Sequence, residues 1–530
     1  MRLDKRFCAR MVFTAGLAVS AVSVFGLVPV HAQTASAGAS AAQGPVRRLS
    51  IDDAVATAIE QNLDLQVQRI NPQIQDSSIG IVRATYTPNF AGQVNLVDQT
   101  QPSSSLLSGS NTSIKSTRNT FDFSVNQQTP WHGGSYTVDW TNGRTTTNNI
   151  FTSFDPQLTS TLSASYTQPL LRNFKIDGTR QQILVSQKNK EISDVQLQQS
   201  IAITVRNVKN AYYDLMYAIG NLTVQRQSLD LAQQSLKDNK ARVEIGTMAP
   251  IDIVQAEAEV ATREEAVILA EAAIDRAQDG LRTLVYNPSA PDFWSARIEP
   301  TEAVTFQPTV VDTDGAVKNA LSQRTDITVA RKQLENNDVN IRYFRNQSLP
   351  DLNASLNYNA QAVGGVQLQR GPSSGLTPGP VIGQIEKSFF STLGTALAGD
   401  FPGWNFQVNV GYPIGNSSNE ASLARAKLQN DQALKQLGSL ELQVSSQVRE
   451  FARQVTTNAK RVDATRSSRV LAERRLEAEE KKYQAGMTSS FFVLQAQRDL
   501  NVARNNELLA LVEYAKSVVN YSAVQQTPLF

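Results

Sequence analysis

The chain has 530 residues, of which 50 are Lys or Arg and 48 are Asp or Glu, so its charge is nearly balanced. Hydrophobic residues make up 41% and charged residues 18%, which excludes a disordered chain and a membrane protein built from many helical spans. The sequence holds one cysteine, Cys8, and two histidines, His31 and His132. Cys8 and His31 fall in a predicted signal peptide (residues 1–32), so the mature chain would keep only His132, which excludes Cys/His zinc sites, thiol catalysis and disulfides. We therefore expect no enzyme, no cofactor and no metal, and the balanced charge indicates no nucleic acid.

Residues 1–32 have the pattern of a signal peptide. A basic start precedes an apolar run over residues 11–30, and Val30–Ala32 places small residues at positions −3 and −1 of a cleavage site. A retained transmembrane anchor is the alternative, because about 18 apolar residues are long enough to span a bilayer. Residues 33–48 are expected to form a flexible segment, and no later stretch is apolar for long enough to form a transmembrane helix.

The next segment reads as a helix over residues 49–87 that ends at Pro88, because proline lacks an amide hydrogen and disfavours helix in the residue before it. Over residues 89–168 apolar and polar side chains alternate, as in Phe121–Val125, which predicts strands with one apolar and one polar face. Such a face packs on a core in a soluble sandwich or meets lipid in a membrane barrel, and the strand pattern alone leaves both open.

The strand region also predicts a hairpin, in which Phe121–Gln127 and Ser135–Thr141 flank a Gly-rich turn. This hairpin either crosses the membrane or projects beyond it. Residues 100–118, and residues 364–400 in the second half of the chain, are predicted to be outward loops.

Residues 173–245 contain no proline and predict a helix roughly 110 Å long at 1.5 Å per residue. Its apolar residues from Ile201 to Leu222 recur in steps of 4 and 3, the period of a left-handed coiled coil. A shorter helix follows over residues 250–285. Stacked end to end, it and the helix over 49–87 match the long helix in length.

The second half of the chain repeats this order of elements. Residues 53–96 align with 315–358 without a gap, and the heptad positions of Val208–Val243 match those of Val448–Tyr483. The chain is predicted to divide into repeat 1 (49–287), a linker (288–310), repeat 2 (311–522) and a C-terminal tail (523–530). In repeat 2 we expect helices over 311–347, 415–485 and 488–522, and strands over about 351–413. Prolines mark the four helix–strand boundaries, at Pro88, Pro169, Pro350 and Pro413.

Two similar turn motifs lie where a long helix meets a half-length helix. The sequence RVEIGT at 242–247 leads to DIVQAE at 252–257, and KYQAGMT at 482–488 leads to VLQAQR at 493–498. With the repeat, the helix lengths and the proline-marked junctions, these motifs make the chain over residues 46–522 resemble the TolC-like outer-membrane factor family, the outer membrane efflux proteins.

The resemblance implies a mixed α+β membrane protein that forms a homotrimer. Three protomers would share one transmembrane β-barrel in the outer membrane, surrounded by its lipid, and one long antiparallel, coiled-coil α-helical barrel in the periplasm. The protein would be the passive exit duct of a tripartite efflux pump or a type I secretion system. Its partners would be a periplasmic adaptor (a membrane fusion protein) and an inner-membrane transporter.

Members of this family are closed at the periplasmic tip by inward-coiled helices with charged or polar rings just past each turn. By this resemblance the candidate gate residues are Asp252, Gln255, Glu259, Gln495 and Asp499. In the second repeat, Phe492 and Gln495 occupy positions that often carry acidic residues in this family. This departure argues against an acidic ring built from that repeat. An acid near a helix start is also explained by the helix dipole alone.

The candidate adaptor-docking residues surround the two turns: Arg242, Gly246, Thr247, Lys482, Gly486 and Thr488. The glycines also suit left-handed turn positions, and cations are favoured at the C-terminal ends of helices, so each of these residues has a purely structural explanation as well.

Two other classes of protein remain open. An exported coiled-coil scaffold or adhesin explains the long helices but leaves the strands unexplained. A simple porin explains the strands but leaves unexplained the helices that make up over half of the chain.

Overall fold

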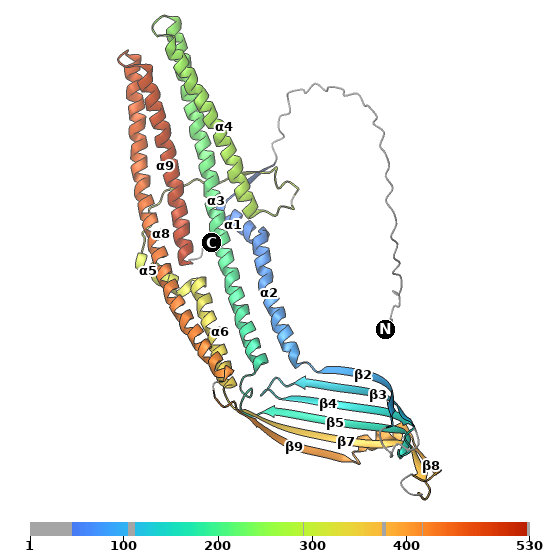
Figure 1. Ribbon diagram of the computed structural model, residues 1–530. Helices are drawn as coiled ribbons and strands as arrows, with labels where there is room; N and C mark the ends of the chain where they lie inside the picture. Colours follow the sequence, from blue (N-terminus) through green and yellow to red (C-terminus); the bar gives the residue numbers. More distant parts are fainter. Residues whose placement is uncertain (1–44, 104–111, 290, 374–377, 416, 527–530) are drawn as a thin grey trace, which may run out of the picture.

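The computed structural model describes residues 45–103, 112–289, 291–373, 378–415 and 417–526. The predicted signal peptide (1–32) and residues 33–44 of the predicted flexible segment lie outside these ranges. A long helical body ends, at one extremity, in a single large antiparallel sheet (Figure 1).

Two helices of 67 residues, α3 (Gly178–Glu244) and α8 (Ser418–Gln484), run the length of the body, about 100 Å each at 1.5 Å per residue. At the end far from the sheet each turns back into a shorter helix, α4 (Ile251–Val285) and α9 (Ser490–Gln525). The shorter helices pack along the long ones, so each pair forms a helical hairpin (Figure 1).

The half of each long helix nearer the sheet is covered by a pair of short helices. In the first half of the chain these are α1 (Ile51–Gln61) and α2 (Leu63–Arg83), and in the second half α5 (Thr313–Gln323) and α6 (Thr325–Gln347). Shorter helices therefore stack end to end along each long helix, and α4 meets α1, and α9 meets α5, at mid-body (Figure 1).

The prediction of one continuous helix over 49–87, and of another over 311–347, was wrong. Asn62 breaks the first, because its side chain accepts a hydrogen bond from the Leu65 amide and donates one to the Leu284 carbonyl, which favours extended backbone over helix. Arg324 breaks the second, with extended backbone (φ −62°, ψ 132°) and its guanidinium bonded to Asp326 and Gln447.

The core lies along the coiled-coil seams. The predicted seam residues of α3 from Val205 to Leu222 are buried or partly buried against α1 and α4, and Val444, Val448 and Val455 of α8 are buried against α5 and α9. Among the described helices, none combines the length and the apolar composition that crossing a membrane requires.

Two short strands hold the middle of the body together. β1 (Val46–Leu49) pairs in parallel with β6 (Arg297–Pro300), and Tyr212 of α3 donates a hydrogen bond to the Leu49 carbonyl at 3.0 Å. The expected flexible segment and the linker therefore each contribute an ordered strand, because Leu49 and Ile298 are apolar and can be buried on α3.

The sheet is built from strands in the two stretches where the sequence alternates. Their order is β2-β3-β4-β5-β7, and the far edge of β7 pairs with β9 along one half and with β8 along the other. The strands are β2 (Asn89–Pro102), β3 (Ser113–Gln128), β4 (Ser135–Thr147), β5 (Phe154–Pro169), β7 (Asp351–Arg370), β8 (Val381–Lys387) and β9 (Pro402–Gly411). Every neighbouring pair is antiparallel, and the predicted hairpin, β3 and β4, is a full part of the sheet.

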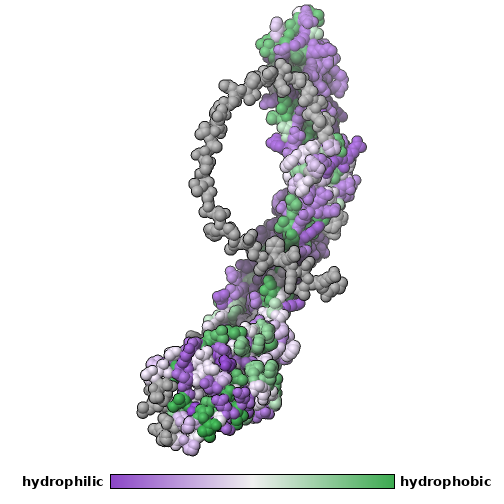
Figure 2. All heavy atoms as spheres, turned by 90° about the vertical axis from the view of Figure 1, so that its right-hand side faces the viewer, coloured by the Kyte–Doolittle hydropathy of each residue, from purple (hydrophilic) through white to green (hydrophobic). Residues whose placement is uncertain are grey.

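The two faces of the sheet differ in polarity. One face is apolar. On β2, β3 and β4 it carries Phe90, Phe123 and Trp140, and on β9 it carries Trp404 and Phe406, two residues apart along the strand. Trp404 is 73% exposed, so the β9 side of this face has no cover among the described residues of one chain. The intervening residues are mostly Asn, Ser, Thr and Gln. Figure 2 shows hydrophobic and hydrophilic residues side by side at the sheet end, and a mostly hydrophilic helical body.

Residues 364–400 are not the outward loop that was predicted. They include the end of β7, β8 and a ten-residue helix, α7 (Phe389–Ala398). The Ser388 side chain caps the start of α7 by accepting a hydrogen bond from Ser391, and Gly399 ends the helix with a positive φ of 71°. Thr392 and Ala396 of α7 are buried on the sheet over β5 and β7.

Candidate functional site

The predicted site residues lie at the tip of the body, where both hairpins turn (Figure 1). Gly246 and Gly486 have φ of +81° and +72°, so both turns use the left-handed conformation that glycine adopts without strain. The amide after each glycine donates a hydrogen bond to the carbonyl five residues earlier, Arg242 or Lys482, at 2.9 Å in both turns. The structure thus supports a structural role for both glycines.

Thr247 and Lys482 make contacts within their own hairpins. The Thr247 hydroxyl donates to the Arg242 carbonyl at 3.0 Å, and the Lys482 ammonium lies 2.7 Å from a Glu479 carboxylate oxygen. Thr488 is partly buried just before α9. The Thr247 bond closes the first turn, and the Lys482 ion pair lies within α8.

Tyr483 joins the tips of the two hairpins. The Arg242 guanidinium of α3 lies 4.5 Å from the centre of the Tyr483 ring of α8, and the Tyr483 hydroxyl donates to Asn239 at 2.9 Å. Burial raises the pKa of the Tyr483 hydroxyl above its usual value, so it stays protonated and available as a donor.

Sequence reasoning missed a set of exposed apolar residues around both turns. Ile245 is 74% exposed and Met487 is 78% exposed, and each lies next to its turn glycine. The signal was present in the sequence, since apolar residues directly beside a turn glycine have no core to enter. The exposed apolar tip residues are Ile245, Ile251, Val254, Met487, Phe491 and Phe492.

The structure brings two of the predicted gate residues to the contact between the hairpins. Asp252 of α4 accepts a hydrogen bond from the Ser490 hydroxyl of α9 at 3.0 Å. Glu259 is only 5% exposed and lies 2.6 Å from both the Arg263 guanidinium of its own helix and the Arg498 guanidinium of α9. Asp252 and Glu259 therefore link α4 to α9.

The other three gate candidates are placed differently. Gln495 donates to Asp499 at 2.9 Å, and Asp499 lies 2.7 Å from the Arg475 guanidinium of α8, so these two residues hold the second hairpin together. Gln255 is exposed on α4. Only Gln495 and Asp499 bond to each other, and among the described residues none makes a hydrogen bond with the Gln255 side chain.

Two opposing effects act on the pKa of Glu259. Burial favours the neutral acid and raises this pKa, but hydrogen bonds from Arg498 and Arg263 and their positive charges favour the carboxylate more strongly. The net result is a pKa below the usual range of a glutamic acid. The same contact raises the pKa of Arg498.

The contact between α3 and α9 near the tip is polar, in contrast to the apolar core at mid-body. Asn501 of α9 donates to Gln225 of α3 at 3.2 Å, and Gln497 donates to Ser235 at 3.0 Å. A cavity of about 260 Å³ lies beside these contacts, with Arg242 and Tyr483 among its lining residues. Water can replace hydrogen bonds of this kind at much lower cost than it can wet an apolar seam.

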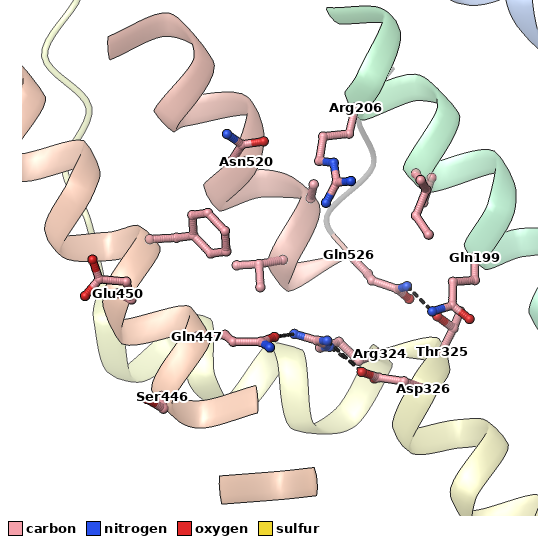
Figure 3. A pocket seen from close by; sticks show the side chains of 15 residues that line it. Gln199, Arg206, Arg324, Thr325, Asp326, Ser446, Gln447, Glu450, Asn520 and Gln526 are labelled. Atoms are coloured by element: carbon pink, nitrogen blue, oxygen red, sulfur yellow. Dashed lines mark hydrogen bonds and ion pairs between the residues drawn. The ribbon is translucent and has the colours of Figure 1, made fainter. Parts of the chain in front are cut away.

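A second cavity, of about 560 Å³, lies at mid-body where the end of α9 meets the break between α5 and α6. Figure 3 shows Arg324 bonded to Asp326 and Gln447, while Gln526 donates to the Thr325 hydroxyl at 2.9 Å. These contacts hold the helix break in place, and no predicted site residue lines this cavity.

Comparison with protein families gives one clear match. The model of the outer membrane efflux protein family matches residues 133–285 and 316–523, together more than half of the chain. A search of curated protein sequences finds no match.

Solved structures show the same fold at low sequence identity. The chain resembles a membrane protein from Pseudomonas aeruginosa (15% identity, TM-score 0.63, covering 90% of this chain and 93% of that one). It also resembles the CmeC outer membrane channel of Campylobacter jejuni (15% identity, TM-score 0.63, covering 90% of this chain and 85% of that one). A third similar structure is the outer membrane protein VceC of Vibrio cholerae (13% identity, TM-score 0.62, covering 90% of this chain and 95% of that one).

Proposed function

The chain belongs to the outer membrane efflux protein family, and we propose that it is the passive exit duct of a tripartite efflux pump or a type I secretion system. It is an outer-membrane protein whose helical body lies in the periplasm. The family is one of channels rather than enzymes, and in the proposed role the chain itself catalyses nothing.

The observation that carries the proposal is an open, amphipathic sheet at the end of helices about 100 Å long. Backbone groups at an open sheet edge are not tolerated in lipid, so the free edges of β2 and of β8 and β9 need partners. β2 and β9 run in opposite directions, so β9 of one copy can pair antiparallel with β2 of the next.

A ring of copies joined in this way is a β-barrel with its apolar face toward lipid and its polar face toward water. Following the family resemblance, we take the ring to be a homotrimer, which also arranges the helical bodies into one periplasmic tube. The near-equal lengths of α3 and α8, 67 residues each, and of α4 and α9, 35 and 36 residues, support an origin of the chain from two internal repeats.

At the tip, Asp252 and Glu259 serve as gate residues in this proposal. They join α4 to α9 through Ser490 and Arg498, so opening of the tube requires these contacts to break. Gln495 and Asp499 stiffen the second hairpin, and exposed Gln255 has no contact that assigns it a part in closure.

The turns themselves are the proposed docking points for a periplasmic adaptor, which couples the duct to an inner-membrane transporter. Arg242, Thr247, Lys482 and Thr488 shape the turns held by Gly246 and Gly486. The exposed apolar tip residues supply the contact area, because apolar surface of this kind is enriched where proteins associate.

Cell fractionation tests the whole proposal. We expect the protein in outer-membrane fractions, as a trimer that migrates as one species in mild detergent and dissociates on heating. A monomer in the outer membrane would favour a simple porin, and a soluble secreted protein would favour a coiled-coil scaffold or adhesin.

A further inference from the structure

We propose that the groove between α7 and strands β3–β5 binds an acyl chain of a membrane lipid whose phosphate headgroup is held by Arg144. This inference rests on the proposed function in one respect, that the apolar face of the sheet meets lipid. It adds a specific ligand at a specific place on that face.

The groove is formed by α7 lying on the apolar face instead of extending away from it. The space for the helix is created by small residues: Ala360 and Ala362 of β7 are buried, and a Cβ added to Gly364 would collide with Thr392 of α7. At the side toward β3 and β4 the helix leaves an apolar cavity of about 470 Å³. Its apolar lining residues are Phe121, Phe123, Trp140, Leu158 and Phe389.

The aromatic wall of the groove is held by ring packing and hydrogen bonds. The Phe123 and Trp140 rings lie 5.9 Å apart, and the Trp140 indole donates to the Ser160 hydroxyl at 3.1 Å. Ser160 in turn donates to Asn142 at 2.8 Å, and both are buried. The polar groups beneath the groove are thus satisfied by each other, which leaves an apolar surface suited to a hydrocarbon chain.

Arg144 is the only charged residue that lines this cavity, and within the described part of the chain its side chain has no ion pair or hydrogen bond. It pairs with Leu158 across the sheet, three residues before β4 ends at the extremity far from the helical body. A cation on a lipid-facing surface costs little only near the headgroups, so Arg144 lies at the level where lipid phosphates are found.

The start of α7 reinforces the positive charge at this point. Phe389, the first residue of α7, lines the same cavity as Arg144, and the N-terminus of a helix carries partial positive charge. A guanidinium and the first residue of a helix that line the same apolar groove fit a phosphate-bearing lipid, with the phosphate at the mouth and one chain inside.

Native mass spectrometry of the full chain in detergent, titrated with phosphatidylglycerol, tests this assignment. We expect Arg144→Gln to bind this lipid about tenfold more weakly, the effect of losing one charge-assisted hydrogen bond. Phe389→Ala is expected to weaken binding as well, because it removes part of the groove wall. Diacylglycerol, which lacks the phosphate, is expected to bind weakly and equally to the wild type and Arg144→Gln.

The matched control is Arg118→Gln. Arg118 on β3 lies one register position away from the partner of Arg144, is also exposed, and faces the opposite, polar side of the sheet. Equal lipid binding by Arg144→Gln and Arg118→Gln would overturn the proposal, as would binding of glycerol phosphate as tight as that of the lipid. Conductance of the wild type in planar bilayers separates this inference from the proposed function. A wild type that conducts but binds no phosphatidylglycerol refutes only this inference.

Discussion

Glu259 is the buried acid at the contact between the two hairpin tips. It is buried and bonded to two arginines, so replacing it leaves Arg263 and Arg498 without their anionic partner. We predict that Glu259→Gln weakens the α4–α9 contact by about 2 kcal/mol, the usual size of a charged hydrogen bond, and shifts the tip toward the open state roughly 30-fold.

Single-channel conductance in planar bilayers measures this effect as a larger open fraction. The matched control is Glu257→Gln, two residues away, whose carboxylate makes an exposed ion pair with Lys240 at 2.9 Å. Exposed pairs contribute little, so the control is expected to behave as the wild type. Equal open fractions in both variants would exclude Glu259 from the gate.

The lowered pKa of Glu259 also predicts the pH dependence of the tip. A carboxylate whose pKa is lower in the folded contact stabilises that contact fully at neutral pH and loses this effect as the pH falls through the lowered pKa. Channel opening by acid is therefore expected only below the range where ordinary carboxyl groups titrate. The Glu259→Gln channel should not show this opening at low pH. If it opens at the same pH as the wild type, another group causes the acid response.

At the scale of elements, the two tips present apolar side chains that the fold does not cover. Ile245→Asp and Met487→Asp place charges beside the turn glycines without removing a buried contact, so the fold is expected to remain intact. We predict that each lowers crosslinking to the adaptor at least tenfold and abolishes export when the two are combined.

Val310→Asp is the control for these charges, since Val310 is almost fully exposed at mid-body, away from both tips. It is expected to leave crosslinking and export unchanged. If the Ile245→Asp and Met487→Asp variants still crosslink to the adaptor, the adaptor docks on a surface other than the turns.

For the whole molecule, the open edges of the sheet predict which strands meet between copies. The only cysteine of the sequence is Cys8, in the predicted signal peptide, so a disulfide in the mature protein can form only between introduced cysteines. Pairs placed along β2 and β9, beginning with Asn95→Cys and Gln407→Cys, should form covalent trimers on oxidation. Thr141→Cys on the central strand β4, combined with Gln407→Cys, should give no crosslink between copies.

Much of the helical architecture could be predicted because it depends on local pattern. The seam from Ile201 to Leu222 repeats every seven residues, and Pro88 and Pro350 follow the helices that lead into the sheet, so these helix lengths and boundaries follow from short-range rules. The helix breaks escaped prediction. Asn62 and Arg324 end their helices through bonds to residues far away in the sequence, Leu284 and Gln447.

By itself, then, the sequence determined the alternation of the strands, the long coiled-coil helices and the two glycine turns, since each is set by residues that are close neighbours in the chain. Only the tertiary structure decided that Glu259 meets Arg498, 239 residues later, and that α7 folds back onto the small residues of β7. Such contacts depend on how separate elements pack, and no local pattern records the partner of a buried charge or the surface on which an apolar helix lies.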